Sequence, residues 1–388
     1  MSLLEHLDAD LRERKAQGLY RHRRTVDGPQ GVLQQLDGRE VLSFCSNDYL
    51  GLAADPRLAE AMRDGSRCYG VGSGAAHLIS GHSRAHHLLE EELADFVGAE
   101  RALLFSTGYM ANLGVLDALL GRGDTLLQDK LNHASLIDGA MLSQARLKRY
   151  LHGDMVSLRR QADSAEGNLL IASDGIFSMD GDLAPIPDLV EVAEELDAAL
   201  MIDDAHGFGV LDDFGRGSVR ALGLSMTQVP IYMATLGKAL GTAGAFVAGS
   251  ESLIETLIQR ARPYVYTTAM PAAVAEAARA SLSIVAEEPW RRERLAELIA
   301  HFRQGAQALG LQLVDSPTPI QPILLGDSNT ALAWHEALLQ TGILVTAIRP
   351  PTVPAGSARL RVTLSAQHEL AQVDHLLAAL RSLTEATL

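Results

Sequence analysis

Short apolar runs, separated by segments with helical periodicity, fill the middle of the chain. Most of these runs are continuous rather than alternating, which is typical of strands that are covered on both faces. Most of the connecting segments are long enough for a helical crossover between parallel strands. The pattern predicts an α/β fold with a mostly parallel sheet of seven strands, at residues 102–105, 125–128, 147–151, 169–172, 200–202, 231–234 and 245–248.

The last two of these strands are too close in sequence for a parallel crossover. Only residues 235–244 separate them, whereas a crossover takes a dozen or more residues. We therefore expect them to be antiparallel neighbours. Their connecting loop contains Lys238 among small and apolar residues, which are surroundings in which a lysine readily loses its charge.

Two helices are marked by apolar residues at helical spacing that end just before a glycine, Gly98 and Gly310. Beyond the second helix we expect a smaller α+β domain, with strands near 321–325 and 360–363 and helices around 331–340 and 369–383. The predicted organisation is an N-terminal segment of residues 1–45, a large domain of residues 46–285 and a small C-terminal domain of residues 286–388.

Composition narrows the choice of ligands. Lys and Arg number 33 against 48 Asp and Glu, a net charge of −15, and aromatic residues make up 5% of the chain. A general nucleic-acid binder needs a basic face and stacking rings, so we expect no nucleic acid as partner. Positive charge does gather near the N-terminus, in a cluster that suits either a solvated helix or an anionic ligand: Arg12, Arg14, Lys15, Arg21, Arg23 and Arg24.

Cysteine content and hydropathy bear on the compartment. The chain has only two cysteines, Cys45 and Cys68, too few for a disulfide framework, which favours a reducing compartment. No window approaches the roughly 20 apolar residues of a membrane span, and the first residues carry acids where a signal peptide needs positive charge. We expect a cytoplasmic protein.

Three segments carry candidate chemistry. Residues 106–112 (STGYMAN) lead from a strand into a helix, which predicts either an ordinary N-cap or a phosphate site at the helix N-terminus. Asp203 and His206 follow a buried strand and could hold a protonated ring nitrogen, or could be a capping aspartate and a core histidine. Together with the loop lysine Lys238, these groups meet the requirements for binding pyridoxal phosphate.

Two further motifs superficially fit other kinds of binding site. Residues 70–74 (GVGSG) do not follow a strand, so a dinucleotide-binding loop is disfavoured. His82 and His86 are four residues apart, a spacing compatible with two metal ligands, but no further catalytic acid accompanies them as in metalloproteases. We expect these histidines to lie on a helix surface, and we expect no metal.

At these positions the sequence resembles the α-oxoamine synthases, pyridoxal-phosphate enzymes of fold type I that join an amino acid to an acyl thioester. The resemblance covers nearly the whole chain. It rests on motifs that occur in order: 46–52 (SNDYLGL), 72–74 (GSG), 80–82 (SGH), 106–112, 132–135 (NHAS), 174–182 (DGIFSMDGD), 203–207 (DDAHG), 235–238 (TLGK) and 267–271 (TTAMP).

The resemblance implies roles for the residues around the cofactor. Lys238 would form the Schiff base and then act as the catalytic base. Asp203 would pair with the pyridine nitrogen, and His133 would stack on the ring and contact the substrate. His206 and Ser178 would bind the phenolic oxygen of the ring. The phosphate would be held by Gly108, Tyr109 and Thr235, with Thr267 or Thr268 of a second subunit.

It also implies how substrates are bound. Arg361 would bind the amino-acid carboxylate as a fork, Arg21 and Thr352 would contact the acyl donor, and Asn47 would reach the site across a homodimer. Residues 348–354 (IRPPTVP) are most similar to the branch of the family that condenses L-alanine with pimeloyl-CoA or pimeloyl-acyl carrier protein in biotin biosynthesis.

Alternatives remain within and outside this family. The sister enzymes that make 5-aminolevulinate, 2-amino-3-oxobutyrate or 3-ketosphinganine use glycine or serine instead of alanine. An aminotransferase of the same fold would consume no thioester. A non-enzymatic or metal-binding α/β module built on the histidine cluster would bind no aldehyde cofactor.

Overall fold

Seven strands form the large sheet of the computed structural model, which describes residues 3–16 and 19–387. Their spatial order is β4-β10-β9-β8-β7-β5-β6. The strands are β4 (Arg101–Phe105), β5 (Thr125–Asp129), β6 (Arg146–Tyr150), β7 (Leu169–Asp174), β8 (Ala199–Asp203), β9 (Ile231–Thr235) and β10 (Ala245–Gly249). Neighbours from β6 to β9 are parallel, whereas β10 is antiparallel to both β9 and β4. The predicted sheet and its predicted antiparallel pair are confirmed.

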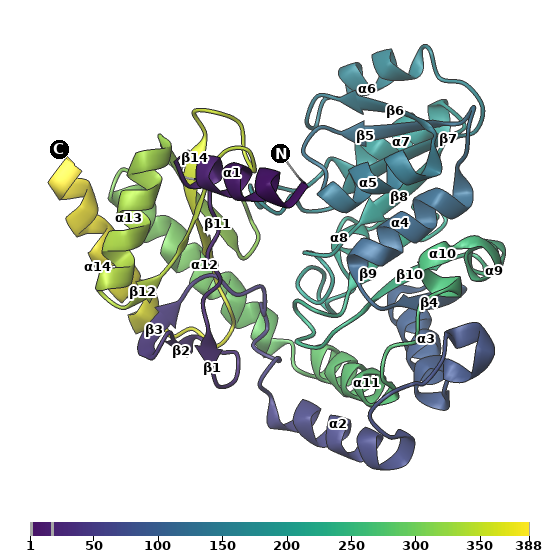
Figure 1. The fold of residues 1–388 in the computed structure, drawn as a ribbon, viewed down its shortest axis with the longest axis horizontal. Coiled ribbons are helices and arrows are strands. Elements are labelled where there is room, and N and C mark those ends of the chain that lie inside the picture. The colour runs from purple at the N-terminus through teal and green to yellow at the C-terminus, as the bar shows by residue number, and fades with distance from the viewer. Residues whose placement is uncertain (1–2, 17–18, 388) are drawn as a thin grey trace.

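Helices cover both faces of this sheet (Figure 1). One apolar core joins it to α4 (Gly108–Leu119), α5 (Ala134–Ser143) and α9 (Glu251–Arg260), and a second core joins it to α3 (Arg84–Val97), α6 (Met155–Ala162), α7 (Ile186–Glu195) and α11 (Ala272–Glu287). On β7, Leu170 and Ala172 belong to the first core and Ile171 to the second. Burial on both faces explains why the strands are continuous apolar runs in the sequence. Shorter elements complete this part: α2 (Pro56–Tyr69), the π-helix His77–Gly81, α8 (Ser218–Ala221) and α10 (Arg262–Val265).

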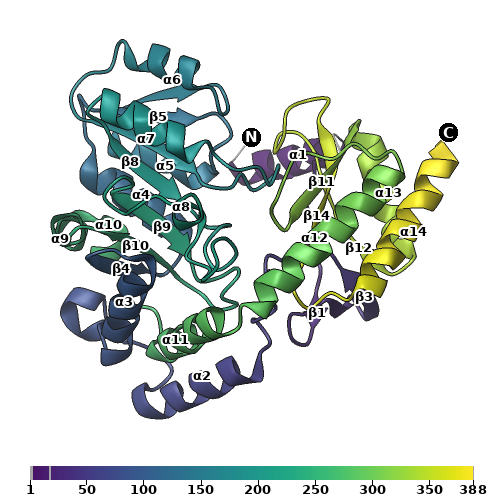
Figure 2. The same ribbon diagram turned by 180° about the vertical axis from the view of Figure 1, so that it is seen from behind.

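The C-terminal elements gather apart from the large sheet, as Figures 1 and 2 show from opposite sides. They contain a three-stranded sheet in the order β11-β14-β13. Its strands are β11 (Ile320–Gly326), β13 (Thr346–Ile348) and β14 (Ala358–Thr363), and its neighbouring helices are α12 (Trp290–Ala308), α13 (Ser328–Gln340) and α14 (Leu370–Thr387). The expected α+β elements of this region are confirmed.

The N-terminal segment lies against these C-terminal elements. After α1 (Leu3–Ala16) come β1 (Val26–Asp27), β2 (Leu33–Leu36) and β3 (Arg39–Ser43). They form a sheet with β12 (Ile343–Leu344), in which Leu42 of β3 is paired with Ile343. The proposed division at residues 45 and 285 stays a prediction, and this pairing places the first segment with the last one.

The parallel strands bring polar residues to one edge of the large sheet. Strands β7, β8 and β9 end at Asp174, Asp203 and Thr235, and Asp174 is paired with Asp203 in the sheet register. Helix α4 begins at Gly108, next to this edge (Figure 1). Ligands of open α/β sheets bind at this edge. Among the described residues, no helix is long and apolar enough to cross a membrane.

Candidate active site

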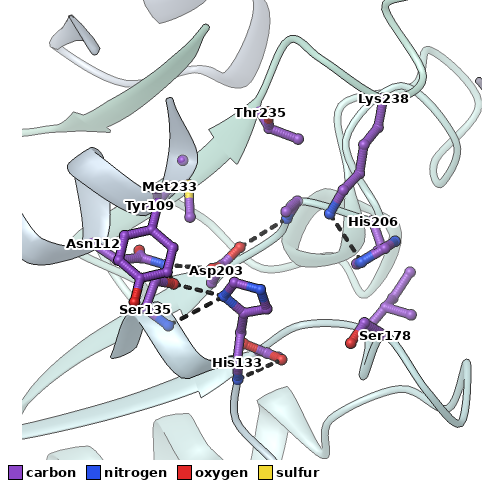
Figure 3. A pocket seen from close by; sticks show the side chains of 14 residues that line it. Tyr109, Asn112, His133, Ser135, Ser178, Asp203, His206, Met233, Thr235 and Lys238 are labelled. Carbon is purple, nitrogen blue, oxygen red and sulfur yellow. Dashed lines mark hydrogen bonds between the residues drawn. The ribbon is translucent and has the colours of Figure 1, made fainter. Parts of the chain in front are cut away.

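A cavity of about 210 Å³ lies at this edge of the sheet (Figure 3). Its lining includes all eight residues that the sequence predicts to hold the cofactor. The full lining is Gly108, Tyr109, Asn112, His133, Ser135, Asp174, Ile176, Ser178, Asp203, Ala205, His206, Met233, Thr235 and Lys238. The structure thus brings these eight together, and the individual role of each stays a prediction.

The N-terminus of α4 forms one end of the cavity. Thr107 is its N-cap, and its side chain accepts a hydrogen bond from the Met110 backbone N–H at 3.2 Å. Gly108 and Tyr109 belong to the first turn, where backbone N–H groups have no partner inside a helix, and both line the cavity. The two interpretations of this motif are therefore compatible, because the helix is capped and still presents N–H groups and its positive dipole end to an anion.

The Asp203 carboxylate is held in place from two sides. Its Oδ1 accepts from the Ala205 backbone N–H at 3.0 Å, and its Oδ2 accepts from the Asn112 amide at 2.7 Å. The same amide nitrogen donates to Ser135 Oγ at 2.8 Å. Asp203 is 5% exposed, so a carboxylate with fixed orientation faces the cavity. It is suited to hold a proton on a ligand's ring nitrogen.

The neighbouring Asp204 points elsewhere. Its carboxylate accepts from the Ser218 backbone N–H at 2.7 Å and from the Tyr232 hydroxyl at 2.8 Å. Burial raises the pKa of Asp204 to about 7, and it does not line the cavity. Of the two adjacent aspartates, only Asp203 is available to a ligand.

His133 occupies the centre of the site (Figure 3). Its Nδ1 accepts from the Ser135 backbone N–H at 3.3 Å, so the proton of the neutral ring is on Nε2. Burial is the main reason why the pKa of His133 is lowered, which keeps the ring neutral. Its backbone N–H donates to Asp174 at 3.1 Å, and burial together with the nearby Asp203 raises the pKa of Asp174 well above its ordinary value.

Tyr109 lies at the mouth of the cavity. Its ring meets the His133 ring edge-on, with centroids 6.2 Å apart and an interplanar angle of 80°. Its hydroxyl donates to Asp138, on the first turns of α5. The side chain of Tyr109 therefore connects α4 to α5 beside the site, while its backbone is available to an anion.

Lys238 extends into the cavity from the loop between β9 and β10. Its Nζ is 2.9 Å from Nε2 of His206. Burial lowers the pKa of Lys238 to about 8, against the opposing effect of Asp203 and Asp174. Burial also lowers the pKa of His206 well below its ordinary value. A lysine that exchanges readily between ammonium and amine can form a Schiff base and accept a proton.

The predicted substrate residues are only partly assembled. Arg361 is buried and donates from Nε to the Ser178 carbonyl at 2.6 Å, while both of its Nη atoms lie 3.3 Å from Asn47 Oδ1. Asn47 therefore contacts Arg361 of its own chain, and its expected reach across a homodimer stays a prediction. Arg21, Thr352 and Thr268 are exposed and Thr267 is half-buried, and none of the four lines the cavity.

The histidine cluster differs from the expected helix surface. His86 is fully buried, its Nε2 donates to the Met270 carbonyl at 2.8 Å, and its Nδ1 accepts from the Ser83 N–H at 3.0 Å. Both nitrogens are thus in use, and burial lowers its pKa. His82 is half-buried, with its Nδ1 3.0 Å from Nδ1 of His77. The expectation of surface residues is wrong for His86, and the expectation of no metal stays a prediction.

Four contributors were not singled out from the sequence: Tyr49, Asn112, Ser135 and Asp174. Each lies inside one of the motifs described above, so the motifs located them without assigning them a contact. Tyr49 and Asn112 contact His206 and Asp203 from positions 157 and 91 residues away. Contacts between residues so far apart in the sequence can be recognised only in the folded structure.

The residues present fit pyridoxal 5′-phosphate. The cavity offers backbone N–H groups for a phosphate, an oriented carboxylate for a ring nitrogen and an amine whose pKa is about 8. A buried oxygen, Asp174 Oδ1, has no hydrogen-bond partner among the described residues. The cavity thus combines polar groups that a ligand can satisfy with an amine that can bind an aldehyde.

Comparison with known proteins identifies the class. The aminotransferase class I and II family matches residues 39–380. A serine palmitoyltransferase from S. paucimobilis, solved with bound PLP and myriocin, has a TM-score of 0.93 at 29% identity, covering 100% of this chain and 99% of that one. Fold and site are thus those of a pyridoxal-phosphate-dependent enzyme of fold type I.

Closer relatives define the family. The 8-amino-7-oxononanoate synthase of Nitrosococcus oceani is 63% identical over 372 residues, which are 96% of this chain and 99% of the relative. The solved 8-amino-7-oxononanoate synthase of Francisella tularensis is 33% identical, with a TM-score of 0.78 and coverage of 89% and 98%. The chain belongs to the 8-amino-7-oxononanoate synthase family.

Proposed function

We propose that this protein condenses L-alanine with a pimeloyl thioester to give 8-amino-7-oxononanoate, carbon dioxide and the free thiol carrier. The observation that carries the proposal is the common cavity of Lys238, Asp203 and the α4 N-terminus. The 63% identity to a relative named 8-amino-7-oxononanoate synthase supports the choice of reaction.

Bound pyridoxal phosphate supplies an electron sink for the charge that develops on the α-carbon of the amino acid. Lys238 accepts the α-proton at Nζ, and its pKa of about 8 leaves part of it as free amine at neutral pH. Asp203 holds the proton on the ring nitrogen with a carboxylate that Asn112 and the Ala205 N–H keep aligned. The neutral His133 lines the same cavity and would shield the bound cofactor from water.

Arg361 holds the carboxylate of alanine. Its guanidinium is fixed by the Ser178 carbonyl at 2.6 Å and by Thr363 Oγ1 at 2.9 Å, which sets the plane of the fork. The contacts with Asn47 Oδ1 are longer, at 3.3 Å, so they yield to a carboxylate more easily. A charged fork of this kind binds carboxylates in one orientation.

The acyl donor enters from the side of the basic N-terminal cluster. Arg21 and Thr352 contact the donor, whose carrier is coenzyme A or an acyl carrier protein, both of them anionic. Two copies of the chain form a homodimer, in which Thr267 or Thr268 reaches the phosphate of the partner site. We also propose that the protein is cytoplasmic, with no membrane or nucleic-acid partner.

Thiol release tests the reaction directly. The purified protein with added pyridoxal phosphate should release thiol from pimeloyl-CoA or pimeloyl-acyl carrier protein only when alanine is present. Glycine and serine are the matched alternatives, and Lys238→Ala is the inactive control. Turnover with serine or glycine but not alanine would replace the proposal with that of a sister enzyme, and no thiol release with any of the three would reject it.

A further inference from the structure

A series of polar contacts connects Lys238 to Arg361. His206 lies between Lys238 and Tyr49, with Nε2 2.9 Å from Lys238 Nζ and Nδ1 2.6 Å from the Tyr49 hydroxyl. The Tyr49 hydroxyl is in turn 3.2 Å from Asn47 Oδ1, which accepts from Arg361 at 3.3 Å. Tyr49 is fully buried, so water does not compete for its hydroxyl.

The direction of the protons along this series of contacts follows from the donors and acceptors. An ammonium group only donates, so His206 Nε2 must accept while Lys238 is charged. Burial keeps His206 neutral by lowering its pKa, and a neutral imidazole carries its single proton on the other nitrogen. Nδ1–H therefore donates to Tyr49, whose own proton is directed to Asn47 Oδ1, an atom that only accepts.

The series of contacts can reverse when Lys238 loses its proton. An amine has a lone pair that can accept from Nε2–H, provided that His206 moves its proton to that nitrogen. The Tyr49 hydroxyl can then donate to Nδ1, because a hydroxyl is both donor and acceptor. Burial raises the pKa of Tyr49 to about 12, so its proton is retained throughout. A residue that could only donate, or only accept, would serve one of the two states.

We infer that Tyr49 is a positioning residue. Its hydroxyl keeps Nε2 of His206 available to accept from the charged Lys238, and it allows the His206 ring proton to move from Nδ1 to Nε2 when Lys238 becomes neutral. The inference deepens the proposed function, because it concerns the residue assigned as base. Other charged or titratable groups act on the same pair, and all are retained in the variants below: Asp174, Asp203, His133 and Arg361.

The test replaces Tyr49 with phenylalanine, which removes one oxygen and keeps the ring. Nδ1 of His206 then has no buried partner, and an unpaired lone pair is easier to accommodate than an unpaired N–H. The Nε2–H form is favoured, and the ammonium of Lys238 loses its acceptor. We expect the pKa of Lys238 to fall from about 8 to about 7, since a hydrogen bond to a charged group is lost.

Competitive acetylation of the full-length, cofactor-free chain measures this pKa without any substrate. The labelling of the peptide that contains Lys238 is followed against pH by mass spectrometry. Tyr264→Phe is the matched control, because Tyr264 is also buried but belongs to α10 and does not line the cavity. It should leave the titration of Lys238 unchanged.

Further measurements keep the outcome decisive. Nitrogen NMR of the His206 ring should show Nδ1–H in the wild type and Nε2–H in Tyr49→Phe at pH 7. A folded Tyr49→Phe protein with the wild-type titration and ring state would overturn the inference, as would an equal change in Tyr264→Phe. If Tyr49→Phe does not fold, Asn47→Leu tests the inference in the same assay. It removes the acceptor of the Tyr49 hydroxyl, so that this hydroxyl donates to Nδ1 of His206 instead. The Nε2–H form is then favoured, and the pKa of Lys238 should again fall. None of these outcomes depends on alanine or on the thioester, so a failure of the proposed reaction is seen separately.

Discussion

Replacing Arg361 with lysine keeps a positive charge in the site but removes the planar fork. In the structure the guanidinium makes four hydrogen bonds, through Nε to Ser178, through Nη1 to Thr363 and through both Nη atoms to Asn47. These bonds fix its orientation before the substrate arrives. A lysine has one nitrogen and cannot reach the same partners while offering two parallel donors to a carboxylate.

The size of the effect follows from the bonds lost. A hydrogen bond to a charged group contributes about 1.5–3 kcal/mol, and each 1.4 kcal/mol is a factor of about ten in binding. Losing one such bond to the substrate carboxylate should raise the KM for alanine about 10- to 150-fold. The affinity for pyridoxal phosphate should change little, because Arg361 does not line the cavity that holds the predicted cofactor residues.

Steady-state thiol release at varied alanine concentration measures this change. Arg359→Lys is the control, since Arg359 lies two residues away on β14 and is buried in an ion pair with Asp180. We expect the control to lower the melting temperature but to leave the KM for alanine within about twofold, because no substrate contact is lost. A normal KM in Arg361→Lys, or an equal rise in Arg359→Lys, would refute the assignment of the carboxylate site.

Three further predictions concern the cofactor residues and stability. Lys238→Ala should lack the visible absorption that the wild type gains with pyridoxal phosphate and should retain no cofactor after borohydride reduction; a wild-type spectrum would exclude Lys238. Asp203→Asn should still bind the cofactor but exchange the α-proton of alanine with solvent at least ~100-fold more slowly, as measured by proton NMR in heavy water, and unimpaired exchange would remove Asp203 from its role. His152 lies 3.1 Å from Asp129 and 2.8 Å from Asp182, and these carboxylates raise its pKa to about 10. This stabilisation is complete below the ordinary pKa of about 6.5 and is lost as the pH rises towards 10, so in urea unfolding the advantage of wild type over His152→Gln should shrink over that range; a constant difference would contradict it.

Much of the large sheet could be predicted because both of its faces are covered. Leu170 and Ile171 are buried on opposite sides of β7, so the strand has no polar face and is recognised as one apolar run. The N-terminal strands gave no such signal. β2 is four residues long, with Leu33 exposed and Leu36 buried, and its partners β1 and β3 have two and five residues. Their hydropathy does not distinguish such short segments from a loop.

The candidate site could likewise be predicted only in part from the sequence. Gly108, Asp203 and Lys238 could be placed together because strand ends and helix starts converge at one edge of a parallel sheet. Asn112, by contrast, lies within a helical motif, and its contact with Asp203 depends on the distance between α4 and β8. His86 was misplaced for the same reason, because the Met270 carbonyl that makes its burial tolerable is 184 residues away.

The pairing of β3 with β12 affects how the chain can fold during synthesis. Leu42 emerges about 300 residues before its partner Ile343, which at ~5–20 residues per second is a delay of about 15–60 s on the ribosome. Strands β4 to β10 are all translated within that interval, so the large sheet can form while β3 still lacks its partner β12. The nascent N-terminal hairpin must therefore be kept from aggregating until translation is nearly complete.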